Sequence, residues 1–482
     1  MNIEELKKIN NKTILVFGDL MVDKYITGNV SRISPEAPVP ILAVTNKQSK
    51  LGGAGNVINN VTSLGGKTKI LGCVGNDEDG SWITKTLSQR GIDISYLKCS
   101  DEVKTISKTR LVSKNQQFLR FDEEIIKDIP KSYEEYVIKN IEEIFADVDV
   151  LVVSDYGKGT VTKTLCEFLI QTANKKNIPS IVDPKGTDYS KYFGATVCTP
   201  NVNELKVVTG KKADSEDEIL AAGKKLLKDT NLKYLMLTRS EKGISLFAKG
   251  EEEKQDFPAI SKDVVDVSGA GDTVVSTVAL LLAAGFTAQE CCVLANFSAS
   301  IVCSKFGTAT LSLNELMETV AHSGEFKLID VTTAKYIVAA LKEKGKKAVF
   351  TNGCFDLLHA GHLSSFLQAK KFGDVLIVAV NSDKSVKRIK GDLRPVISET
   401  DRIKMLCALE CVDYVIVMED NDPSAIISEI KPDIAVKGKD WQGKKMPELD
   451  ILNSYGGKME YIELDAGHST TNIIEKIIKA YE

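Results

Sequence analysis

The sequence is poor in the residues that mark several common kinds of protein. Among its 482 residues it has only 4 histidines and 2 tryptophans, and its 10 cysteines are scattered with no C-x-x-C spacing. Structural zinc sites need clustered cysteine or histidine ligands, so this scarcity argues against a zinc-stabilised fold. We interpret the cysteines as reduced thiols of a cytoplasmic protein.

Long apolar runs and runs of one charge are also missing. The most apolar stretch, 274–286, is interrupted by Ser276 and Thr277 and is too short to span a bilayer. The first ten residues carry charges and no apolar segment, so we expect no secretory signal. The net charge of -4 comes without a basic arm. We therefore expect a cytoplasmic protein that binds neither membranes nor nucleic acid.

The length and the pattern of apolar runs predict two α/β domains. A prior of roughly 150 residues per domain gives two or three domains for this chain. Apolar runs that alternate with amphipathic segments predict strands at 13–17, 150–153, 181–183, 234–237, 347–350, 375–380, 414–417 and 434–436. Alternating strands and helices favour parallel sheets. Short pieces punctuated by glycine and proline between 24 and 120 indicate a smaller sheet or lid.

The boundary between the domains is predicted in a polar stretch after residue 313. We assign 1–318 to the first domain, 319–345 to a linker with a connecting helix at 332–344, and 346–482 to the second domain. A fresh strand at 347–350 then opens the second series of strands and helices. No repeat and no low-complexity segment is present.

The first constellation that carries chemistry is VDVSGAGDT, at 265–273. Gly269 and Gly271 let the backbone turn tightly and approach a ligand. An apolar helix follows, and the free N–H groups at its start suit a phosphate group. Asp272 would then accept a proton from a hydroxyl that attacks a phosphoryl group. The alternative is a plain turn in which Asp272 caps the helix.

Four other segments support the chemical interpretation. GDLMVD (18–23) follows the first strand, where open α/β sheets bind ligands, and GGAGN (52–56) is a second close-approach loop. TPNVNE (199–204) and LTRSEKG (237–243) lie at predicted strand ends. In this order and spacing, residues 10–315 resemble the ribokinase-like carbohydrate kinases, whose closing motif D-x-x-G-A-G-D is met by Asp266 to Asp272.

This resemblance implies a sugar kinase that uses Mg²⁺ and ATP, with Asp272 as the base. The residues implied to bind ATP are Asn201, Val202, Asn203, Glu204, Thr238, Gly243, Gly269, Ala270, Gly271 and Asn296. Those implied to bind the sugar substrate are Asp19, Asp23, Gly52, Gly53, Asn56, Arg110, Arg120, Asp155 and Lys185. No direct metal ligand is expected, although Glu204 could hold magnesium through water. Two assignments have a structural alternative: Asp19 as a cap, and Asn296 as a helix surface residue.

The second constellation is NGCFDLLHAGH, at 352–362, which holds half of the histidines. A metal site is one interpretation of His359 and His362, but the only nearby candidates for a third ligand are carboxylates, and zinc sites usually show a clearer set of ligands. A structural turn is the second. The third is phosphate chemistry, because the histidines follow a strand and precede a helix whose N-terminus suits an anion. Two imidazoles there could donate hydrogen bonds to a phosphoryl group under attack.

H-A-G-H fits the H-x-G-H signature of the nucleotidyltransferase superfamily, which residues 345–480 resemble. The resemblance implies a Rossmann-like fold, magnesium, a nucleoside triphosphate and a phosphate acceptor that displaces pyrophosphate. His359 and His362 would stabilise the α-phosphate. Further nucleotide-binding residues are implied at Thr351, Asn352, Gly353, Phe355, Lys390, Arg394, Lys437, Gly438, Asp440, Ser469, Thr470 and Thr471.

Together the halves resemble the family of bifunctional enzymes that join a heptose phosphate kinase to an adenylyltransferase. SRISPEAPVP (31–40), LVVSDYGKG (151–159) and VAVNSDKSVKRIKGDLRPV (378–396) carry this likeness. It implies phosphorylation of D-glycero-D-manno-heptose 7-phosphate at O1, then transfer of AMP from ATP to heptose 1-phosphate, giving ADP-heptose for lipopolysaccharide. By analogy we expect a homodimer through the kinase domain.

Three alternatives remain open from the residues alone. The first is a kinase/cytidylyltransferase that makes a CDP-linked sugar or polyol. The second is a binding or regulatory protein without turnover, and the third is a fusion in which only one half is active. Basic side chains that could grip a 7-phosphate are Arg32, Lys108, Arg110 and Arg120, although each could be an ordinary surface charge.

Overall fold

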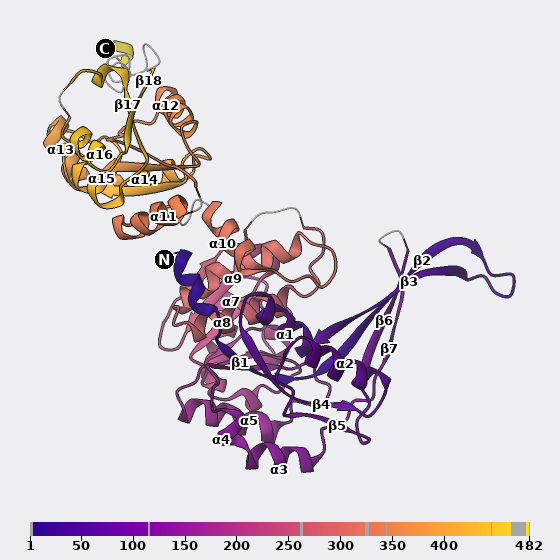
Figure 1. Cartoon of the computed structure of the whole chain (residues 1–482). Coiled ribbons are helices and arrows are strands. Elements are labelled where there is room, and N and C mark those ends of the chain that lie inside the picture. The colour runs from indigo at the N-terminus through magenta and orange to yellow at the C-terminus, as the bar shows by residue number, and fades with distance from the viewer. Residues whose placement is uncertain are drawn as a thin grey trace. The chain divides into compact units, whose positions relative to one another are not determined.

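The computed structural model describes residues 3–113, 116–260, 264–322, 327–343, 345–444, 446–463 and 479–481. Contacts divide the chain into two compact units (Figure 1). The first is Leu6–Leu316, and the second is Met317–Glu482 together with Met1–Glu5. None of the helices described is both long and apolar enough to cross a membrane.

A large, mostly parallel sheet forms the centre of the first unit. In the described residues its order is β13-β12-β11-β10-β9-β8-β1-β4-β5, and only β12 and β13 run antiparallel to their neighbours. The strands are β1 (Thr13–Gly18), β4 (Lys67–Gly75), β5 (Leu97–Ser100), β8 (Val150–Ser154), β9 (Ser180–Asp183), β10 (Val197–Cys198), β11 (Tyr234–Thr238), β12 (Ile244–Ala248) and β13 (Gln255–Phe257). The strands predicted in this part of the chain are confirmed.

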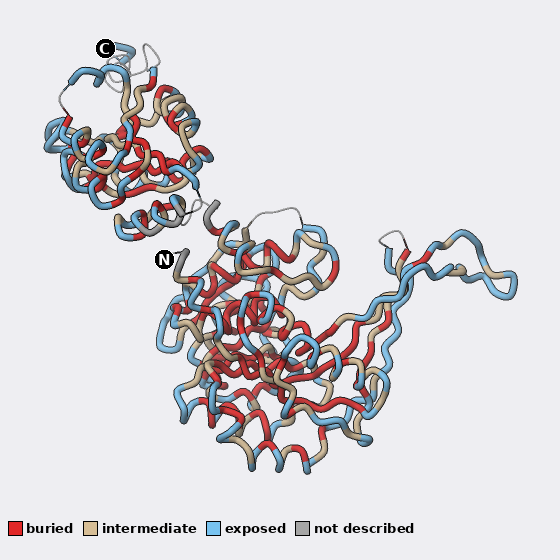
Figure 2. The backbone as a smooth tube through the Cα atoms, viewed as in Figure 1, coloured by how far each residue is buried: buried red, intermediate tan, exposed pale blue. Residues whose placement is uncertain are grey.

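Helices cover both faces of this sheet, which explains why its central strands are mostly apolar. The helices are α1 (Ala54–Ser63), α2 (Glu78–Gln89), α3 (Lys131–Lys139), α4 (Ile141–Ile144), α5 (Lys163–Lys175), α6 (Val202–Thr209), α7 (Glu216–Thr230), α8 (Ala270–Ala283) and α9 (Ala288–Cys303). The next helix, α10 (Leu313–His322), spans the boundary between the two units. Leu15 and Leu151 pack with α3, α5 and α7 on one face. On the other face α8 lies over β8 and β9 and contacts α1 and α9. The buried residues are concentrated along these central strands (Figure 2).

A second, smaller sheet extends from the first unit as a lid, in the order β3-β2-β6-β7 (Figure 1). Its strands are β2 (Leu20–Ile33), β3 (Pro40–Gly53), β6 (Ile106–Ser113) and β7 (Gln116–Glu123). The predicted lid is therefore confirmed, but its predicted range of 24–120 was too broad. Between β3 and β6 the chain returns to the main layers as α1, β4, α2 and β5. The far end of the β2–β3 hairpin is exposed (Figure 2).

The second unit holds a parallel sheet of order β16-β15-β14-β17-β18 in the described residues. Its strands are β14 (Ala348–Gly353), β15 (Val375–Asn381), β16 (Tyr414–Met418), β17 (Ile434–Gly438) and β18 (Lys458–Ile462). Its helices are α11 (Val331–Glu343), α12 (Ala360–Lys370), α13 (Asp383–Lys390), α14 (Glu399–Cys407), α15 (Ser424–Ile430) and α16 (Pro447–Ser454). This is the predicted Rossmann-like layering.

The strand order reverses between β14 and β17, which places a ligand crevice beyond their carboxyl ends. Phe366 and Leu406 of α12 and α14 pack on one face of the sheet, and Val338 and Ile427 of α11 and α15 pack on the other. The predicted connecting helix at 332–344 is confirmed as α11. Because α11 packs on α15, it belongs to the second unit.

Candidate active sites

Asp272 lies in the first turn of α8 and is 7% exposed. The Asn56 Nδ2 donates to Asp272 Oδ2 over 2.7 Å, and the Tyr156 hydroxyl donates to Asp272 Oδ1 over 2.7 Å. Burial raises the pKa of Asp272 to about 6, although these two hydrogen bonds act against the shift. A carboxyl group with this pKa is suited to act as a general base near neutral pH.

The helix start at Asp272 has the geometry of a ligand-binding turn. Gly269 is the N-cap with φ 84°, so no side chain caps the start of this helix. The alternative in which Asp272 caps the helix is therefore wrong. A Cβ on Gly269 would lie 2.9 Å from Asn56 Nδ2, whereas one on Gly271 would meet nothing within 4 Å. The space beside Gly271 is open to a ligand.

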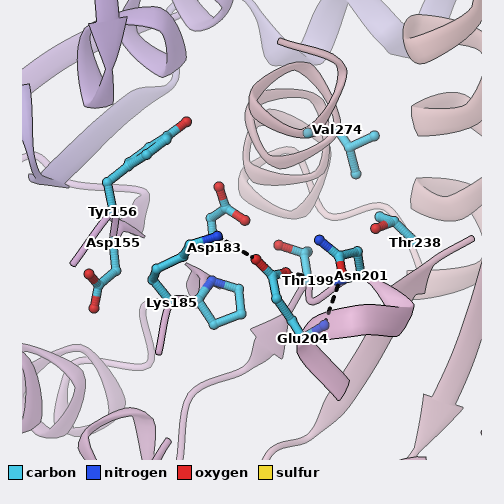
Figure 3. A pocket seen from close by; sticks show the side chains of 11 residues that line it. Asp155, Tyr156, Asp183, Lys185, Thr199, Asn201, Glu204, Thr238 and Val274 are labelled. Carbon is cyan, nitrogen blue, oxygen red and sulfur yellow. Dashed lines mark hydrogen bonds and ion pairs between the residues drawn. The ribbon is translucent and has the colours of Figure 1, made fainter. Parts of the chain in front are cut away.

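That space is part of a pocket of about 200 Å³ beside the carboxyl ends of β8, β9, β10 and β11 (Figure 3). Its lining residues come from five segments of the sequence, and the sequence-predicted ones among them are Asp155, Lys185, Asn201, Glu204, Thr238 and Gly271. Asn201 and Glu204 form a reciprocal capping box at the start of α6, and Lys185 Nζ lies 3.0 Å from Glu204 Oε1. Val202 and Asn203 lie in the same helical turn but do not line the pocket.

The other five lining residues were not predicted as site residues; they are Tyr156, Asp183, Pro184, Thr199 and Val274. Burial raises the pKa of Asp183 well above its usual range, and the nearby carboxylates of Asp272 and Glu204 add to this effect. Asp183 is the last residue of β9, so its place at a strand's carboxyl end was the signal that could have found it. Asp183 reaches the pocket from the end of β9, and Glu204 reaches it from the first turn of α6 (Figure 3).

Several predicted sugar-binding residues gather on the lid side of Asp272, whereas Asp155 and Lys185 line the pocket beside Glu204 instead. Asp23 of β2 is buried, and its Oδ1 accepts a hydrogen bond of 2.6 Å from Arg110 Nη1 of β6. Gly52 stands opposite, because a Cβ there would lie 2.4 Å from Asp23 Oδ2. Gly53 adopts φ 58° and ends β3 just before α1, which carries Asn56. The structure thus brings Asp23, Gly52 and Asn56 together with the base.

Asp19 and Asp155 have carboxylates that the protein itself engages. Asp19 accepts backbone N–H bonds from Tyr156, Lys158 and Thr160, at 2.8, 3.1 and 2.9 Å. Asp155 accepts from Gly157 N, Lys191 and the Tyr192 hydroxyl. These contacts favour the structural alternative for Asp19, and they give Asp155 a similar role in fixing the loop after β8.

Gly243 and Asn296 shape one loop beyond β11. Asn296 Nδ2 donates to the carbonyl oxygens of Phe257 and Pro258, at 2.9 and 3.1 Å. Gly243 has φ 82°, and a Cβ there would lie 2.2 Å from the Phe257 oxygen. Asn296 is only 6% exposed, so the alternative of a helix surface residue is wrong. Its amide holds the end of β13, near the predicted nucleotide side of the pocket.

The cations of the lid differ in how far they are already paired. Arg120 forms a two-pronged pair with Asp122, and Arg110 pairs with Asp23. Lys108 forms no ion pair within the described part of the chain, and its Nζ lies 5.7 Å from the Tyr156 ring centroid. Arg32 is exposed on the outer part of β2. Lys108 is near enough to Asp272 to lower its pKa, and Arg110 is held by Asp23 on the same side.

In the second unit, His359 is the N-cap of α12 and His362 lies in its first turn. The two rings stack at 3.8 Å between centroids, and Phe355 meets His362 edge-on at 5.3 Å. Burial lowers the pKa of His362 to about 4, and the neighbouring His359 adds to this shift. His362 is therefore neutral at pH 7. No group of three or more potential metal ligands occurs among the described residues.

The turn after β14 surrounds the histidines with the predicted nucleotide-binding residues. Thr351, Asn352 and Gly353 end β14, and a Cβ on Gly353 would lie 2.9 Å from the Phe355 ring. Arg394 pairs with the buried Asp356, which also accepts the Val396 and Ile397 N–H groups. Arg394 thus stands beside the histidine turn, while its guanidinium already has an anionic partner.

The remaining predicted residues are distributed over three places. Lys437 Nζ pairs with the buried Glu448 at 3.2 Å and lies 5.1 Å from the Trp441 ring. Gly438 and Asp440 follow at the end of β17 and in the short helix Lys439–Trp441. Lys390 is exposed at the end of α13. The predicted phosphate-binding residues Ser469, Thr470 and Thr471 lie outside the described residues.

Arg402 of α14 was not predicted, although it is fully buried beside the histidine turn. Its Nη1 donates to the carbonyl oxygens of Cys354 and Asn381 over 2.6 and 2.7 Å, and its Nη2 donates to Asp383 Oδ1 over 2.7 Å. The Nε donates to the Ile397 carbonyl oxygen over 3.2 Å. One guanidinium therefore joins the ends of β14 and β15 with the loop that carries Arg394.

Arg402→Met is expected to destabilise the second unit by roughly 3–5 kcal/mol, because it leaves several buried acceptors without a donor. Chemical unfolding followed by a probe in the second unit measures this. Lys404→Met on the same helix is the matched control, since Lys404 is exposed and should change stability by less than about 0.5 kcal/mol. Equal stability of the two variants would contradict the role given to Arg402.

Comparison with known proteins defines the class of each half. The pfkB carbohydrate kinase family matches residues 11–315, and the cytidylyltransferase-like family matches residues 350–476. The first unit is similar in fold to Arabidopsis thaliana ribokinase and Escherichia coli phosphofructokinase-2, with TM-scores of 0.52 and 0.54. Each is 18% identical, and the match covers 64% of this chain with 99% and 98% of the respective structure. The chain is a kinase joined to a nucleotidyltransferase.

Full-length relatives then identify the family. The chain is 41% identical to the bifunctional protein HldE of Syntrophotalea carbinolica, over 100% of this chain and 99% of that protein. It is 42% identical to HldE of Geobacter metallireducens, over 97% and 96%. The chain belongs to the HldE family of bifunctional heptose 7-phosphate kinases and heptose 1-phosphate adenylyltransferases.

Proposed function

We propose that Asp272 is the base of the kinase half and that His359 and His362 serve the adenylyltransferase half. The observation that carries the kinase assignment is the buried Asp272, with a pKa of about 6, next to Gly271 of a pocket suited to ATP phosphates. Asp272 takes the proton from O1 of heptose 7-phosphate as this oxygen bonds to the γ-phosphorus of ATP. The bond from the γ-phosphorus to the β–γ bridging oxygen breaks, and ADP leaves.

The residues around the pocket fit a triphosphate with its magnesium ion. The N-terminus of α8 offers free N–H groups to the transferring phosphoryl group, and Gly271 leaves room for it. Magnesium is usually held by phosphate oxygens, waters and one or two carboxylates. Asp183 and Glu204 are the carboxylates at this place, and Lys185 would meet the phosphates. The ion supplies charge neutralisation when bound.

The sugar is proposed to bind between the lid and Asp272. Asp23 and Asn56 are placed to hold its hydroxyl groups, and Lys108 with Arg110 is placed to meet its 7-phosphate. A separate phosphatase must remove the 7-phosphate before the second half acts, because ADP-heptose carries only the phosphate at C1.

In the second half, an oxygen of heptose 1-phosphate attacks the α-phosphorus of ATP, and pyrophosphate leaves. His359 and the neutral His362 would donate hydrogen bonds to the α-phosphate oxygens, which gain charge in the transition state. Lys390 and Arg394 would meet the departing pyrophosphate. Arg394 already pairs with Asp356, so it must either bind both anions or release Asp356. Lys437 and Gly438 end β17 and Asp440 follows in the short helix, and the base would lie beside them.

We also propose that the protein is cytoplasmic. All ten cysteines are free, in keeping with a reducing compartment.

We propose further that two copies of the chain pair through the lid. Large apolar side chains of the lid are exposed: Phe118, Leu119 and Phe121 on β7 by between 44% and 54%, together with Ile33 and Val44 on the β2–β3 hairpin. Exposed apolar groups on one element commonly mark an interface. Light scattering of the purified chain should give the mass of a dimer, and a monomer at micromolar concentration would contradict the pairing.

Phosphorus NMR of the kinase reaction tests the first half directly. With heptose 7-phosphate, magnesium and ATP, we expect ADP and a sugar carrying two phosphates, one of them coupled to the anomeric proton. Release of ADP with no new anomeric phosphate would contradict phosphorylation at O1. Asp272→Asn in parallel shows whether the signal depends on the proposed site.

A further inference from the structure

Tyr156 is the one hydrogen-bond donor to the base that comes from the loop after β8. Its hydroxyl lies 2.7 Å from Asp272 Oδ1, while Asn56 of α1 occupies Asp272 Oδ2. The carboxylate is therefore gripped from two sides by two elements that are far apart in the sequence. Each oxygen keeps a second lone pair for the substrate hydroxyl.

The protein fixes Tyr156 with more contacts than a surface loop would need. Its backbone N–H donates to Asp19 Oδ2 over 2.8 Å, and the same carboxylate binds the N–H groups of Lys158 and Thr160. Asp155, the preceding residue, is held by Lys191 and Tyr192. Two buried carboxylates therefore anchor the loop that presents this one phenol, which explains why Asp19 and Asp155 are buried beside the site.

The aromatic ring of Tyr156 also meets the lid. Lys108 of β6 places its Nζ 5.7 Å from the ring centroid, within the range of a cation–π contact. Burial lowers the pKa of Lys108, and the attraction of Asp23 opposes this shift. Tyr156 thus touches the base with its hydroxyl and a lid cation with its ring.

We propose that Tyr156 is a positioning residue of the kinase reaction, which holds Asp272 in the orientation and ionisation state needed to receive the proton of the sugar hydroxyl. Tyr156 keeps its own proton throughout. The proton that moves goes from the sugar O1 to Asp272, as in the proposed function on which this inference rests. The hydrogen bond that Tyr156 donates is stronger when Asp272 is charged than when it is protonated.

Every charged or titratable group that faces Asp272 enters its pH dependence. Asp23 of β2 raises its pKa and Lys108 of β6 lowers it, while the charge of Asp272 in turn raises the pKa of Asp183 of β9. Asn56 and Tyr156 lower it by hydrogen bonding. Removing the Tyr156 hydroxyl deletes one bond to the charged form, so the pKa of Asp272 must rise further above about 6. The kinase rate, which needs the charged form, then falls off at a higher pH.

Tyr156→Phe tests this, with Tyr133→Phe as the matched control. Tyr133 is a buried tyrosine of the same unit, and its hydroxyl donates to the Tyr96 carbonyl oxygen over 2.7 Å. It belongs to α3, on the opposite face of the sheet from α8 and Asp272. We expect Tyr156→Phe to lower kcat for the sugar about tenfold at pH 6.5, to move the acid limb of kcat to higher pH, and to change KM for ATP little. Tyr133→Phe should keep the wild-type limb.

The carboxyl ¹³C signal of Asp272 gives a second readout that needs no sugar. Its titration midpoint should rise in Tyr156→Phe and stay unchanged in Tyr133→Phe. If Tyr156→Phe shows the same Asp272 titration midpoint and the same acid limb of kcat as wild type, the inference is overturned. If the wild type itself fails to phosphorylate heptose 7-phosphate, the proposed substrate is wrong, and the carboxyl titration alone then decides the role of Tyr156.

Discussion

Asp272→Asn is expected to lower kcat for sugar phosphorylation by roughly 10²–10⁴-fold, the usual contribution of a general base. The change keeps the size of the side chain and its place in the first turn of α8, but it removes the group that accepts the proton. Since the proton moves only in the transition state, kcat should fall much more than KM rises. Initial rates of ADP formation with saturating ATP measure this.

The adenylyltransferase reaction of the same chain is an internal control for Asp272→Asn. Its adenylyltransferase rate should stay within about twofold of wild type, because that reaction uses the second unit. Asp229→Asn, an exposed aspartate at the end of α7, controls for the loss of one negative charge. If Asp272→Asn keeps more than a tenth of the wild-type kinase kcat, Asp272 is not the base.

His362→Ala is expected to slow adenylyl transfer by roughly 10²–10³-fold, the usual loss when one oxyanion donor is removed. The kinase rate should not change. Leu367→Ala, at an exposed position of α12, is the matched control on the same helix. Pyrophosphate release with heptose 1-phosphate and ATP measures the effect, and a loss below tenfold would show that His362 does not stabilise the transition state.

The pH profile of the second reaction follows from the same geometry. Because burial beside His359 lowers the pKa of His362 to about 4, this ring stays neutral from pH 5 upward. The adenylyl transfer rate should therefore show no limb from His362 between pH 6 and 8. The kinase reaction behaves differently, because Asp272 becomes protonated as the pH falls through about 6.

The sequence was informative wherever a short segment determines the local geometry. The strands β1 and β8 hold continuous apolar runs, 14–17 and 150–153, because both faces of the sheet are covered, so their positions could be predicted. The glycines before Asp272 and the paired histidines are likewise local signals. The order of strands then brings these segments to the carboxyl edge of each sheet.

Other parts of the sites depend on contacts that no short segment reveals. Tyr156 meets Asp272 across 116 positions of the chain, and Asn56 meets it across 216. Arg402 stands in a segment that reads as an exposed helix, and it is buried only because carbonyl groups from three other segments converge on it. Asp19 and Asp155 look like ligands in the sequence, while the fold uses their carboxylates to fix a loop.

The most direct test of the account is a mass spectrum of the nucleotide sugar formed from heptose 1-phosphate, magnesium and equal amounts of ATP and CTP. The account predicts ADP-heptose as the product, formed by wild type and Asp272→Asn and lost in His362→Ala. A CDP-linked product would keep both chemistries and contradict the proposed nucleotide. No nucleotide sugar from the wild type would contradict the assignment of the second unit to heptose activation.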